Sequence, residues 1–453
     1  MNSSDFTHRF TQWFQPDAIV QLARQTRWLL RQGKIDAFEF FTGLIFGQMS
    51  ALGLTLRAQS GCYTEPVTRQ AVDQRYDQSA VDFFHVGFDR CLQQALADRP
   101  GPSLTQELAK HFKAVRLVDS TSFDCPETLD KIYPGCGGKA SSANCKILLE
   151  YEYVHGQFHP LALLPGNRSD QGLASQLPPL VKPGELLITD KGFSTHKGLK
   201  QIDQQEAFFL LPYHRASQVW LPQAEGSPVK LDVAGTLRHT KENVVEWNVY
   251  LGDPADGLRV RLVAYRLGEE SANRHRAALR RSLEKKGKQP TAVSLELAAW
   301  LILITNAPAD KLPTSAMSYL YRVRWQIELV FKQCKSILRL DQTKARKNIH
   351  RVQCEIWARL IAAVVLFAWH SHLQAALPPG SQREMSFAQV ASHIQQMGMT
   401  LALWLIAGGQ ALLDALWQLW RHLLRTALKG RQRTRKTNWE LLHEHWLQLA
   451  EPT

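Results

Sequence analysis

The chain has 453 residues, of which 45% are apolar, enough for a substantial core in two or three domains. Its net charge of +13 at pH 7 points to a polyanionic partner, most simply nucleic acid, although a basic enzyme or a membrane-surface protein would share that balance. The seven cysteines are scattered and include no Cys-x2-Cys pair, which argues against a disulfide scaffold and against structural zinc.

Residues 1–110 are predicted to form a helical domain. Apolar spacing predicts helices over 19–30, 37–52 and 80–96, and Pro66 would lie near the first turn of another over 64–76. Short helices that present cations would suit DNA, but a packing domain with ordinary surface arginines fits equally well; the cations are Arg57, Arg69 and Arg75. The first twenty residues hold charges and no continuous apolar core, so we expect no signal peptide.

The hydrophobic period changes at Ala114, where an α/β core is predicted to begin and to occupy residues 111–212. The predicted strands are 114–118, 145–154, 158–164, 185–189 and 207–211, with a helix over 197–204. The first strand ends at Asp119 and the fourth at Asp190. Three strands in a meander, followed by alternating helix and strand, is the element order of an RNase H-like fold. Either aspartate alone would more often be a residue that caps a turn.

Residues 213–310 are predicted to be a β-rich insertion. Alternating apolar residues predict strands over 219–221, 243–251 and 258–267, and an apolar run predicts another over 299–305. Between them a predicted helix over 271–288 holds the densest cationic segment of the chain: Arg274, Arg276, Arg280, Arg281, Lys285, Lys286 and Lys288. A solvated helix face is the alternative to a binding surface.

Residues 311–375 are predicted to contain a long helix that carries the stretch Tyr321–Lys335, called the signature helix below. At about 100° per residue, four of its side chains fall within an arc of about 60° at the edge of the apolar face. They are Tyr321, Arg324, Glu328 and Lys335. A phenol, a carboxylate and two cations in one line suit a site that handles phosphates and a metal. An exposed helix face with Arg–Glu pairing is the alternative.

The rest of the chain is predicted to be helical. A second basic segment over 344–351 precedes helices from 354 to 377, and the region 376–453 is a candidate for dimerisation or DNA contact. The apolar run 360–369 is too short to span a bilayer, and the run 401–424 is interrupted by Gly408, Gly409 and Asp414. We therefore expect buried helices in a soluble protein.

Taken together and in this order, these motifs resemble the DDE transposases of the insertion-sequence-four family, over roughly residues 30–375. The motifs are Asp119 in Val-Asp-Ser-Thr, Asp190 in Ile-Thr-Asp-Lys-Gly-Phe, the strand Trp-Leu-Ile-Leu-Ile-Thr-Asn and the Tyr-x2-Arg-x3-Glu-x6-Lys spacing. The resemblance implies an RNase H-like catalytic core with a β-rich insertion between helical ends. It also implies that Asp119, Asp190 and Glu328 are the catalytic acids and hold two Mg²⁺ ions, with Mn²⁺ able to substitute.

The resemblance assigns DNA contacts to five further residues. Arg324, Lys335 and Tyr321 would hold phosphates beside the scissile bond. Trp300 would stack on a base flipped out of the duplex, as in hairpin-forming relatives, although a core aromatic is the alternative without the family. Trp325 would wedge the same distorted duplex or face the core.

The function implied is that of an insertion-sequence transposase. It would cleave at terminal inverted repeats, pass through a hairpin intermediate and join the ends to target DNA. Its partners would be double-stranded DNA and a second copy of itself in a synaptic homodimer, without a membrane, in the bacterial cytoplasm beside the nucleoid. Two alternatives are an RNase H-like nuclease without strand transfer and a non-catalytic DNA-binding derivative.

Overall fold

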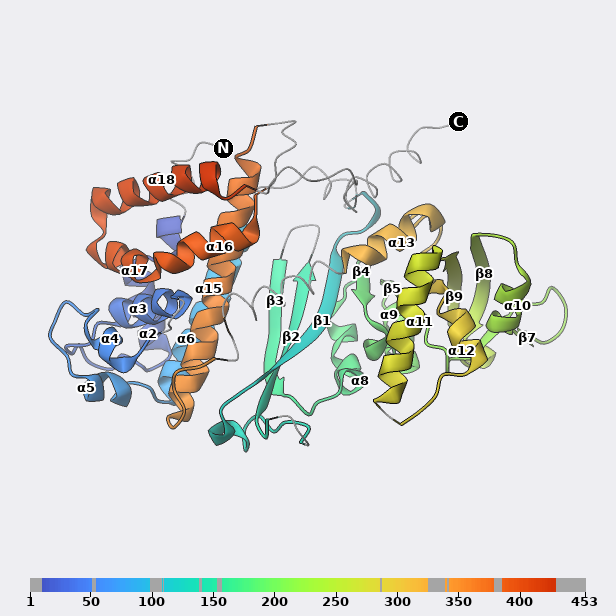
Figure 1. Ribbon diagram of the computed structural model, residues 1–453, viewed down its shortest axis with the longest axis horizontal. Coiled ribbons are helices and arrows are strands. Elements are labelled where there is room, and N and C mark those ends of the chain that lie inside the picture. The colour runs from blue at the N-terminus through green and yellow to red at the C-terminus, as the bar shows by residue number, and fades with distance from the viewer. Residues whose placement is uncertain are drawn as a thin grey trace.

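A ten-stranded sheet positions the candidate site (Figure 1). The computed structural model describes residues 10–50, 54–97, 108, 110–137, 141–152, 157–285, 287–324, 339, 342–378 and 385–428. The strand order is β3-β2-β1-β4-β5-β10-β9-β8-β6-β7. The strands are β1 (Val115–Asp124), β2 (Asn144–Glu152), β3 (Gln157–Pro165), β4 (Leu186–Thr189), β5 (Phe208–Pro212), β6 (Val219–Leu221), β7 (Val229–Lys230), β8 (Val244–Leu251), β9 (Arg259–Arg266) and β10 (Trp300–Thr305).

The first five strands have the topology predicted from the sequence. β1, β2 and β3 form an antiparallel meander, and β4 and β5 then add in parallel on the other side of β1. The helix α9 (His196–Gln204) makes the crossover from β4 to β5. A meander followed by parallel strands is the RNase H-like arrangement, so the predicted fold class is confirmed.

The strands of the insertion continue this sheet and do not form a separate one. β10 pairs antiparallel with β5 on one side and with β9 on the other, and β8, β6 and β7 extend it outward. Three helices accompany these strands: α10 (Val233–His239), α11 (Glu269–Glu284) and α12 (Ala292–Leu297). The predicted strand over 299–305 therefore joins the insertion to the core.

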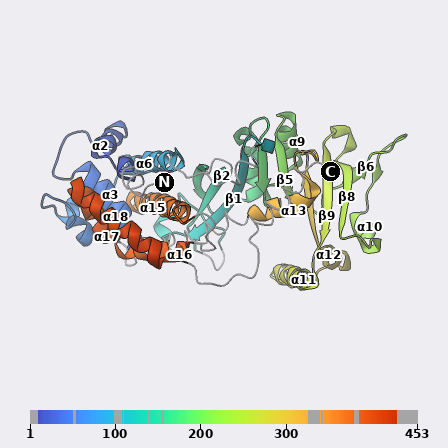
Figure 2. The ribbon, with the colours of Figure 1, turned by 90° about the horizontal axis from the view of Figure 1, so that it is seen from above.

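The two faces of the sheet belong to two hydrophobic cores, because successive side chains of a strand point to opposite faces. On β1, Leu117 packs into the larger core, whereas Val118 packs into the smaller one. The helix α13 (Thr314–Val323) covers the first face through Met317 and Leu320, and α9 covers the other through Leu199. Figure 2 shows α9 and α13 on opposite sides of the sheet.

Helices from both ends of the chain form one helical body beside β3 (Figure 1). All thirteen residues of α3 are buried, mainly against α15 and α17. Among the helices that the structure describes, α15 is long and apolar enough to cross a membrane, but most of it is buried inside the protein. It is a core helix. The body contains α2 (Pro16–Gln25), α3 (Ala37–Met49), α4 (Leu56–Ser60), α5 (Arg69–Gln74), α6 (Gln78–Ala97), α15 (Ile349–Ala375), α16 (Phe387–Gln396), α17 (Gly398–Ala407) and α18 (Gly409–Thr426).

Several boundaries differ from the predicted ones. The helix predicted over 64–76 begins only at Arg69, because the side chain of Thr68 caps it by accepting a hydrogen bond from the amide of Ala71. β1 is longer than predicted, since β2 stays paired with it as far as Asp124. The six cysteines in the described residues are free, as expected. The borders of the five predicted regions stay predictions.

Candidate active site

Asp119 and Asp190 lie side by side on adjacent parallel strands. Val118 on β1 is in register with Thr189, the last residue of β4, and the two aspartates are the next residues along the chain. Parallel neighbours lie roughly 5 Å apart and residues in register share a face, so both carboxylates belong to the face covered by α13. The sequence predicted that Asp119 ends its strand. This is wrong, because β1 continues along β2 as far as Asp124. Asp119 lies where the pairing with β4 stops.

Arg324 faces Asp119 from the end of α13. Its Nη1 lies 3.4 Å from Oδ2 of Asp119, and both side chains are mostly buried. The guanidinium carbon also lies 5.6 Å from the centre of the Tyr321 ring. Three of the predicted site residues therefore lie together: Asp119, Arg324 and Tyr321. A cation beside Asp119 balances a carboxylate that would otherwise be costly to place in a partly buried position.

Asp190 forms a tight turn where its strand ends. Its Oδ1 accepts a hydrogen bond from the amide of Lys191 at 2.7 Å, and its carbonyl accepts one from the amide of Phe193. These bonds begin the short 3-10 helix η4 (Lys191–Phe193), and the buried ring of Phe193 anchors it in the smaller core. The backbone of Asp190 is therefore fixed on both sides, by β4 and by η4.

A buried ion-pair cluster sets the register of the strands that carry the aspartates. Arg116, three residues before Asp119, binds both carboxylate oxygens of Glu185, at 2.6 and 2.8 Å, and also pairs with Glu150 on β2. Burial works to raise the pKa of Glu185, but hydrogen bonds from Arg116 and from the amide of Lys182 outweigh it. The pKa of Glu185 therefore lies below the ordinary 4.5.

Asp170 is a residue that the sequence reasoning missed. Its Oδ1 accepts hydrogen bonds from Ser120 Oγ at 2.6 Å and from Lys146 Nζ at 3.1 Å. Ser120 directly follows Asp119, and Asp170 also lies against Gly192 in η4, where an added Cβ would come within 3.3 Å of it. From the other face of the sheet, Asp170 thus lies against the residue after Asp119 and the second residue after Asp190. Only the helix-capping sequence Ser169-Asp170 marked the position.

Glu328, Lys335 and Trp325 lie outside the residues that the structure describes. Among the described residues, no three His, Cys, Asp or Glu side chains form a group that could hold a metal ion. The two aspartates nevertheless offer the oxygen ligands that Mg²⁺ prefers. In the predicted set, Glu328 would supply the third carboxylate.

Trp300 opens β10, which is separated from β4 by β5. Its ring is 8% exposed, packs in the smaller core, and lies 4.4 Å below the guanidinium of Arg266. Asp119 and Asp190 belong to the opposite face. The structure thus does not bring the indole to the carboxylates, although β10 runs past the carboxyl end of β5 toward the same edge of the sheet.

The basic segments predicted from the sequence divide into exposed and buried cations. Exposed cations lie on α11 and at its C-cap: Arg274, Arg280, Arg281 and Lys285. In the segment 344–351, Lys344, Arg346 and Lys347 are exposed, whereas Arg351 is buried and pairs with Glu355. Arg75 also makes its contacts within the protein: its guanidinium stacks on the Trp28 ring and donates a hydrogen bond to the Trp28 carbonyl.

Comparison with known proteins gives related sequences along nearly the whole chain. A family model described as "Transposase DDE domain" matches residues 110–365. The transposase for insertion sequence element IS231F of Bacillus thuringiensis subsp. israelensis is 25% identical over 458 residues, which covers 96% of this chain and 94% of the relative. The transposase for IS1151 of Clostridium perfringens is 23% identical and covers 95% and 94%.

Among solved structures, a piggyBac transposase synaptic complex with hairpin DNA gives a TM-score of 0.41 at 12% identity. The alignment covers 95% of this chain and 84% of that one. At this level of likeness the comparison adds nothing to the fold, which the strand order establishes.

Proposed function

The chain belongs to the DDE transposase family, since the family domain matches more than half of it, and we propose that it cuts and rejoins DNA at the ends of an insertion sequence. It would nick at terminal inverted repeats, form a hairpin intermediate and transfer the ends to target DNA. The observation that supports this best is that Asp119 and Asp190 directly follow the paired residues Val118 and Thr189 of adjacent parallel strands, with Arg324 beside Asp119.

The proposed site uses carboxylates as ligands and cations as phosphate holders. Asp119, Asp190 and Glu328 would hold two Mg²⁺ ions, or Mn²⁺ in their place. Ions bound in this way activate the attacking oxygen and stabilise the leaving oxygen of a phosphoryl displacement. Arg324 balances the charge of Asp119 in the protein alone, and would grip a phosphate of the scissile strand as a bidentate donor.

The other proposed contacts act on the DNA around the scissile bond. Lys335 would bind a neighbouring phosphate as a point charge, and the hydroxyl of Tyr321 would donate to another phosphate oxygen. Trp300 would stack on a flipped base and so help to offset the cost of unstacking it. Trp325 would wedge the distorted duplex.

The proposed partners follow from the reaction and from the charge. Two inverted repeats and a target must meet in one complex, so we propose a homodimer that binds double-stranded DNA. The net charge of +13 suits that polyanionic partner. A bacterial cytoplasm that contains the nucleoid is the corresponding location.

The experiment uses labelled duplexes that carry the repeats flanking this gene, incubated with the full chain and Mg²⁺. We expect nicked, hairpin and joined products from the wild type, and none from Asp119→Asn, Asp190→Asn or Glu328→Gln. Gel shift should still show end binding by all three variants, because the remaining cations stay in place. Asp124→Asn is the matched control: it changes an exposed aspartate of the same strand and should leave nicking unchanged.

The alternatives appear as distinct outcomes of the same assay. Nicking without joined products would indicate a nuclease without strand transfer. End binding without nicking by the wild type would indicate a non-catalytic derivative. Normal nicking by Glu328→Gln would remove that residue from the proposed set of ligands.

A further inference from the structure

Two buried arginines bind the backbone just before and just after the signature helix. Arg261 lies on β9 and is 7% exposed, and Arg359 lies on α15 and is 2% exposed. The segments that they bind lie 46 to 53 residues from Arg261 and 17 to 20 residues from Arg359, and they flank the stretch Tyr321–Lys335 in the chain. Neither arginine is accessible to DNA, so the proposed phosphate contacts give them no role.

Arg261 holds the segment that leads into the signature helix. Its Nη1 donates to the carbonyls of Ala307 at 3.1 Å and Leu312 at 2.7 Å, and its Nη2 donates to Thr314 Oγ1 at 2.8 Å. Thr314 is the first residue of α13, and its carbonyl also accepts a hydrogen bond from the hydroxyl of Tyr265. Four bonds from β9 thus fix where this helix begins.

Arg359 holds the segment that follows the signature helix. Its guanidinium donates to the carbonyl of Arg339 through Nη1 and to the carbonyl of Gln342 at 2.6 Å through Nη2. Its Nε and Nη2 also donate to Oε1 of Gln48 on α3, at 3.2 and 3.0 Å. The arginine therefore joins this segment to the N-terminal helices through one side chain.

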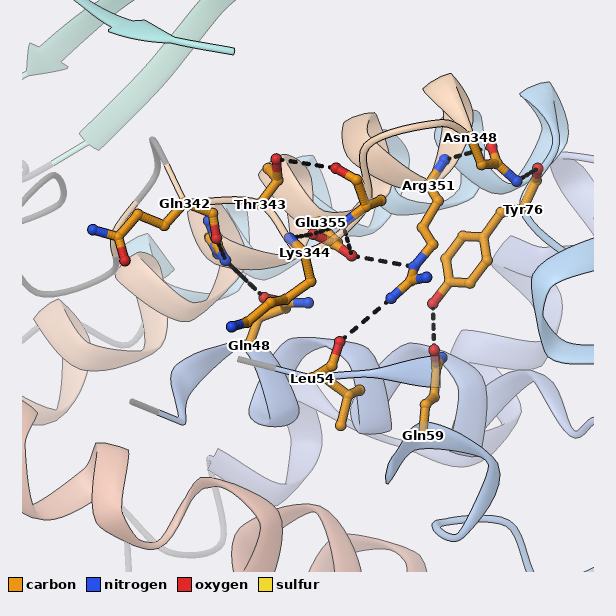
Figure 3. Close-up of polar contacts among 12 residues, drawn as sticks. Gln48, Leu54, Gln59, Tyr76, Gln342, Thr343, Lys344, Asn348, Arg351 and Glu355 are labelled. Atoms are coloured by element: carbon orange, nitrogen blue, oxygen red, sulfur yellow. Dashed lines mark hydrogen bonds and ion pairs between the residues drawn. The ribbon is translucent and has the colours of Figure 1, made fainter. Parts of the chain in front are cut away.

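Glu355, one turn earlier on α15, extends the same attachment (Figure 3). This fully buried carboxylate accepts hydrogen bonds from the amides of Lys344 at 2.7 Å and Ala345 at 3.2 Å. It also pairs with Arg351, which donates to the carbonyl of Leu54. A buried stripe of three charged side chains thus attaches Arg339 and residues 342–345 to the helical body.

Burial of these charges is costly unless nearly all their hydrogen bonds are made. Their burial is therefore weak evidence that they stabilise the fold. A planar guanidinium that bridges two carbonyls does fix the separation and direction of those carbonyls. Each arginine meets this condition with backbone at one end of the signature helix. The arrangement therefore fixes the chain before and after the stretch Tyr321–Lys335.

We propose that Arg261 and Arg359 are positioning residues that hold the chain before and after the stretch Tyr321–Lys335, and so place its site residues relative to Asp119 and Asp190. The inference rests on the proposed function and deepens it. It gives the insertion and the helical body a shared task, since β9 belongs to one and α15 to the other. Loss of either arginine's hydrogen bonds should slow nicking in DNA complexes that have already formed.

The first test measures nicking in preformed complexes with the labelled end duplex at saturating protein and Mg²⁺. We expect Arg261→Met and Arg359→Met to lower the first-order rate constant on the order of a hundredfold, as for a small displacement of catalytic groups. The affinity in gel shift should be unchanged. Arg261→Lys and Arg359→Lys should recover part of the rate, because an ammonium can still bind one carbonyl.

Arg75→Met is the matched control, because Arg75 also binds a backbone carbonyl, that of Trp28, which belongs to neither segment beside the stretch Tyr321–Lys335. It should lower the melting temperature without changing the rate constant. A merely structural role for Arg261 and Arg359 would reduce only the amplitude, as fewer molecules are folded. An unchanged rate constant in both Met variants would overturn the proposal.

The second test needs no cleavage of DNA and uses trypsin on the free protein. Arg261→Met should speed cutting after Lys311, in the segment before α13, and Arg359→Met should speed cutting after Lys344, Arg346 and Lys347. Each variant should leave the other segment protected, as should Arg75→Met. If the wild type does not nick, the proposed function fails, but this test still shows whether Arg261 and Arg359 hold the two segments. Unchanged cutting at both segments would refute that role.

Discussion

Trp300 can be tested as a core residue and as a stacking residue with two substitutions. Its ring is 8% exposed and covered by Arg266. Trp300→Ala should therefore lower the free energy of unfolding by about 3–5 kcal/mol, as for other large core deletions. Trp300→Phe should keep most of that packing but offer a flipped base a smaller ring, which would slow hairpin formation up to about tenfold. Thermal melting beside a gel of nicked and hairpin products gives both quantities.

The ratio of hairpin to nicked product decides between the roles, because a general loss of folded protein lowers both products together. Arg266→Gln is a useful companion, since it uncovers the ring without removing it. If Trp300→Phe leaves the ratio at its wild-type value, the indole is a core residue alone.

Asp170 should influence metal binding although it lies across the sheet from the proposed ligands. It holds Ser120 and contacts Gly192, the neighbours of Asp119 and Asp190. Residues that orient metal ligands typically affect metal affinity or activity by about 10–100-fold. We expect Asp170→Ala to raise the Mg²⁺ concentration needed for half-maximal nicking by about tenfold. Asp170→Asn should raise it less, because an amide oxygen still accepts from Ser120.

A Mg²⁺ titration of the nicking rate measures this effect, and a melting curve for each variant controls for folding. If Asp170→Ala nicks at the wild-type Mg²⁺ concentration, the contacts with Ser120 and Gly192 do not position the proposed ligands.

At the scale of elements, the hydrophobic pattern was enough to predict most of the sheet. Strands such as β4 and β10 are nearly continuous apolar runs, and the order of strands and helices gave the RNase H-like core. The pattern ended β1 too early, because Ser120, Thr121 and Ser122 are polar yet remain paired with β2. Their partners on β2, Leu148, Ile147 and Lys146, lie 24 to 28 residues further along the chain, so no local pattern marks the pairing.

The positions of buried charges could not be predicted for a related reason. Arg261 looks like an exposed residue of an alternating strand, and Arg359 is an isolated cation in an apolar helix. Their hydrogen-bond acceptors are distant in sequence. Arg261 donates to carbonyls about 50 residues away, and Arg359 donates to Gln48 in the N-terminal helices. The candidate acids were found because a family spacing marked them, whereas Asp170 had no such spacing.

The contact between β8 and α13 should depend on pH. Glu246 on β8 accepts hydrogen bonds from Arg261 and from Thr314, the first residue of α13. Burial works to raise the pKa of Glu246, but these hydrogen bonds outweigh it and hold the pKa below 4.5. A depressed folded pKa stabilises the protein above pH 4.5, and the contribution is lost as pH falls through the folded value.

We therefore expect the wild type to have a higher melting temperature than Glu246→Gln at neutral pH. The difference between the two melting temperatures should shrink as the pH falls below 4.5. Melting curves of both proteins over that range give the comparison. A difference that stays constant with pH would mean that the charge of Glu246 does not support the start of α13.

At the scale of the whole molecule, the usable positive charge is less than the sequence suggests. Arg261, Arg351 and Arg359 are buried, and Arg116 pairs with two carboxylates. The exposed cations that remain in the two predicted clusters lie on α11 and in the loop 344–347 before α15. Figure 1 places α11 and the start of α15 on either side of strands β1–β3. A duplex held by both clusters would therefore cross β1, the strand that carries Asp119.

This arrangement predicts how end binding should respond to salt. Affinity should fall steeply with salt, because neutralised phosphates release condensed counterions, with a logarithmic slope of about 0.9 for each phosphate contact. One triple Gln variant removes Arg280, Arg281 and Lys285, and another removes Lys344, Arg346 and Lys347. Each should flatten the slope by about one for every phosphate that the variant no longer neutralises. The control replaces Lys230, Lys241 and Arg421, exposed cations outside both clusters, and removes the same charge. Gel shifts across a salt series measure the slopes of the wild type, the two cluster variants and the control. If the control flattens the slope as much as the cluster variants do, the effect comes from net charge and not from the two clusters.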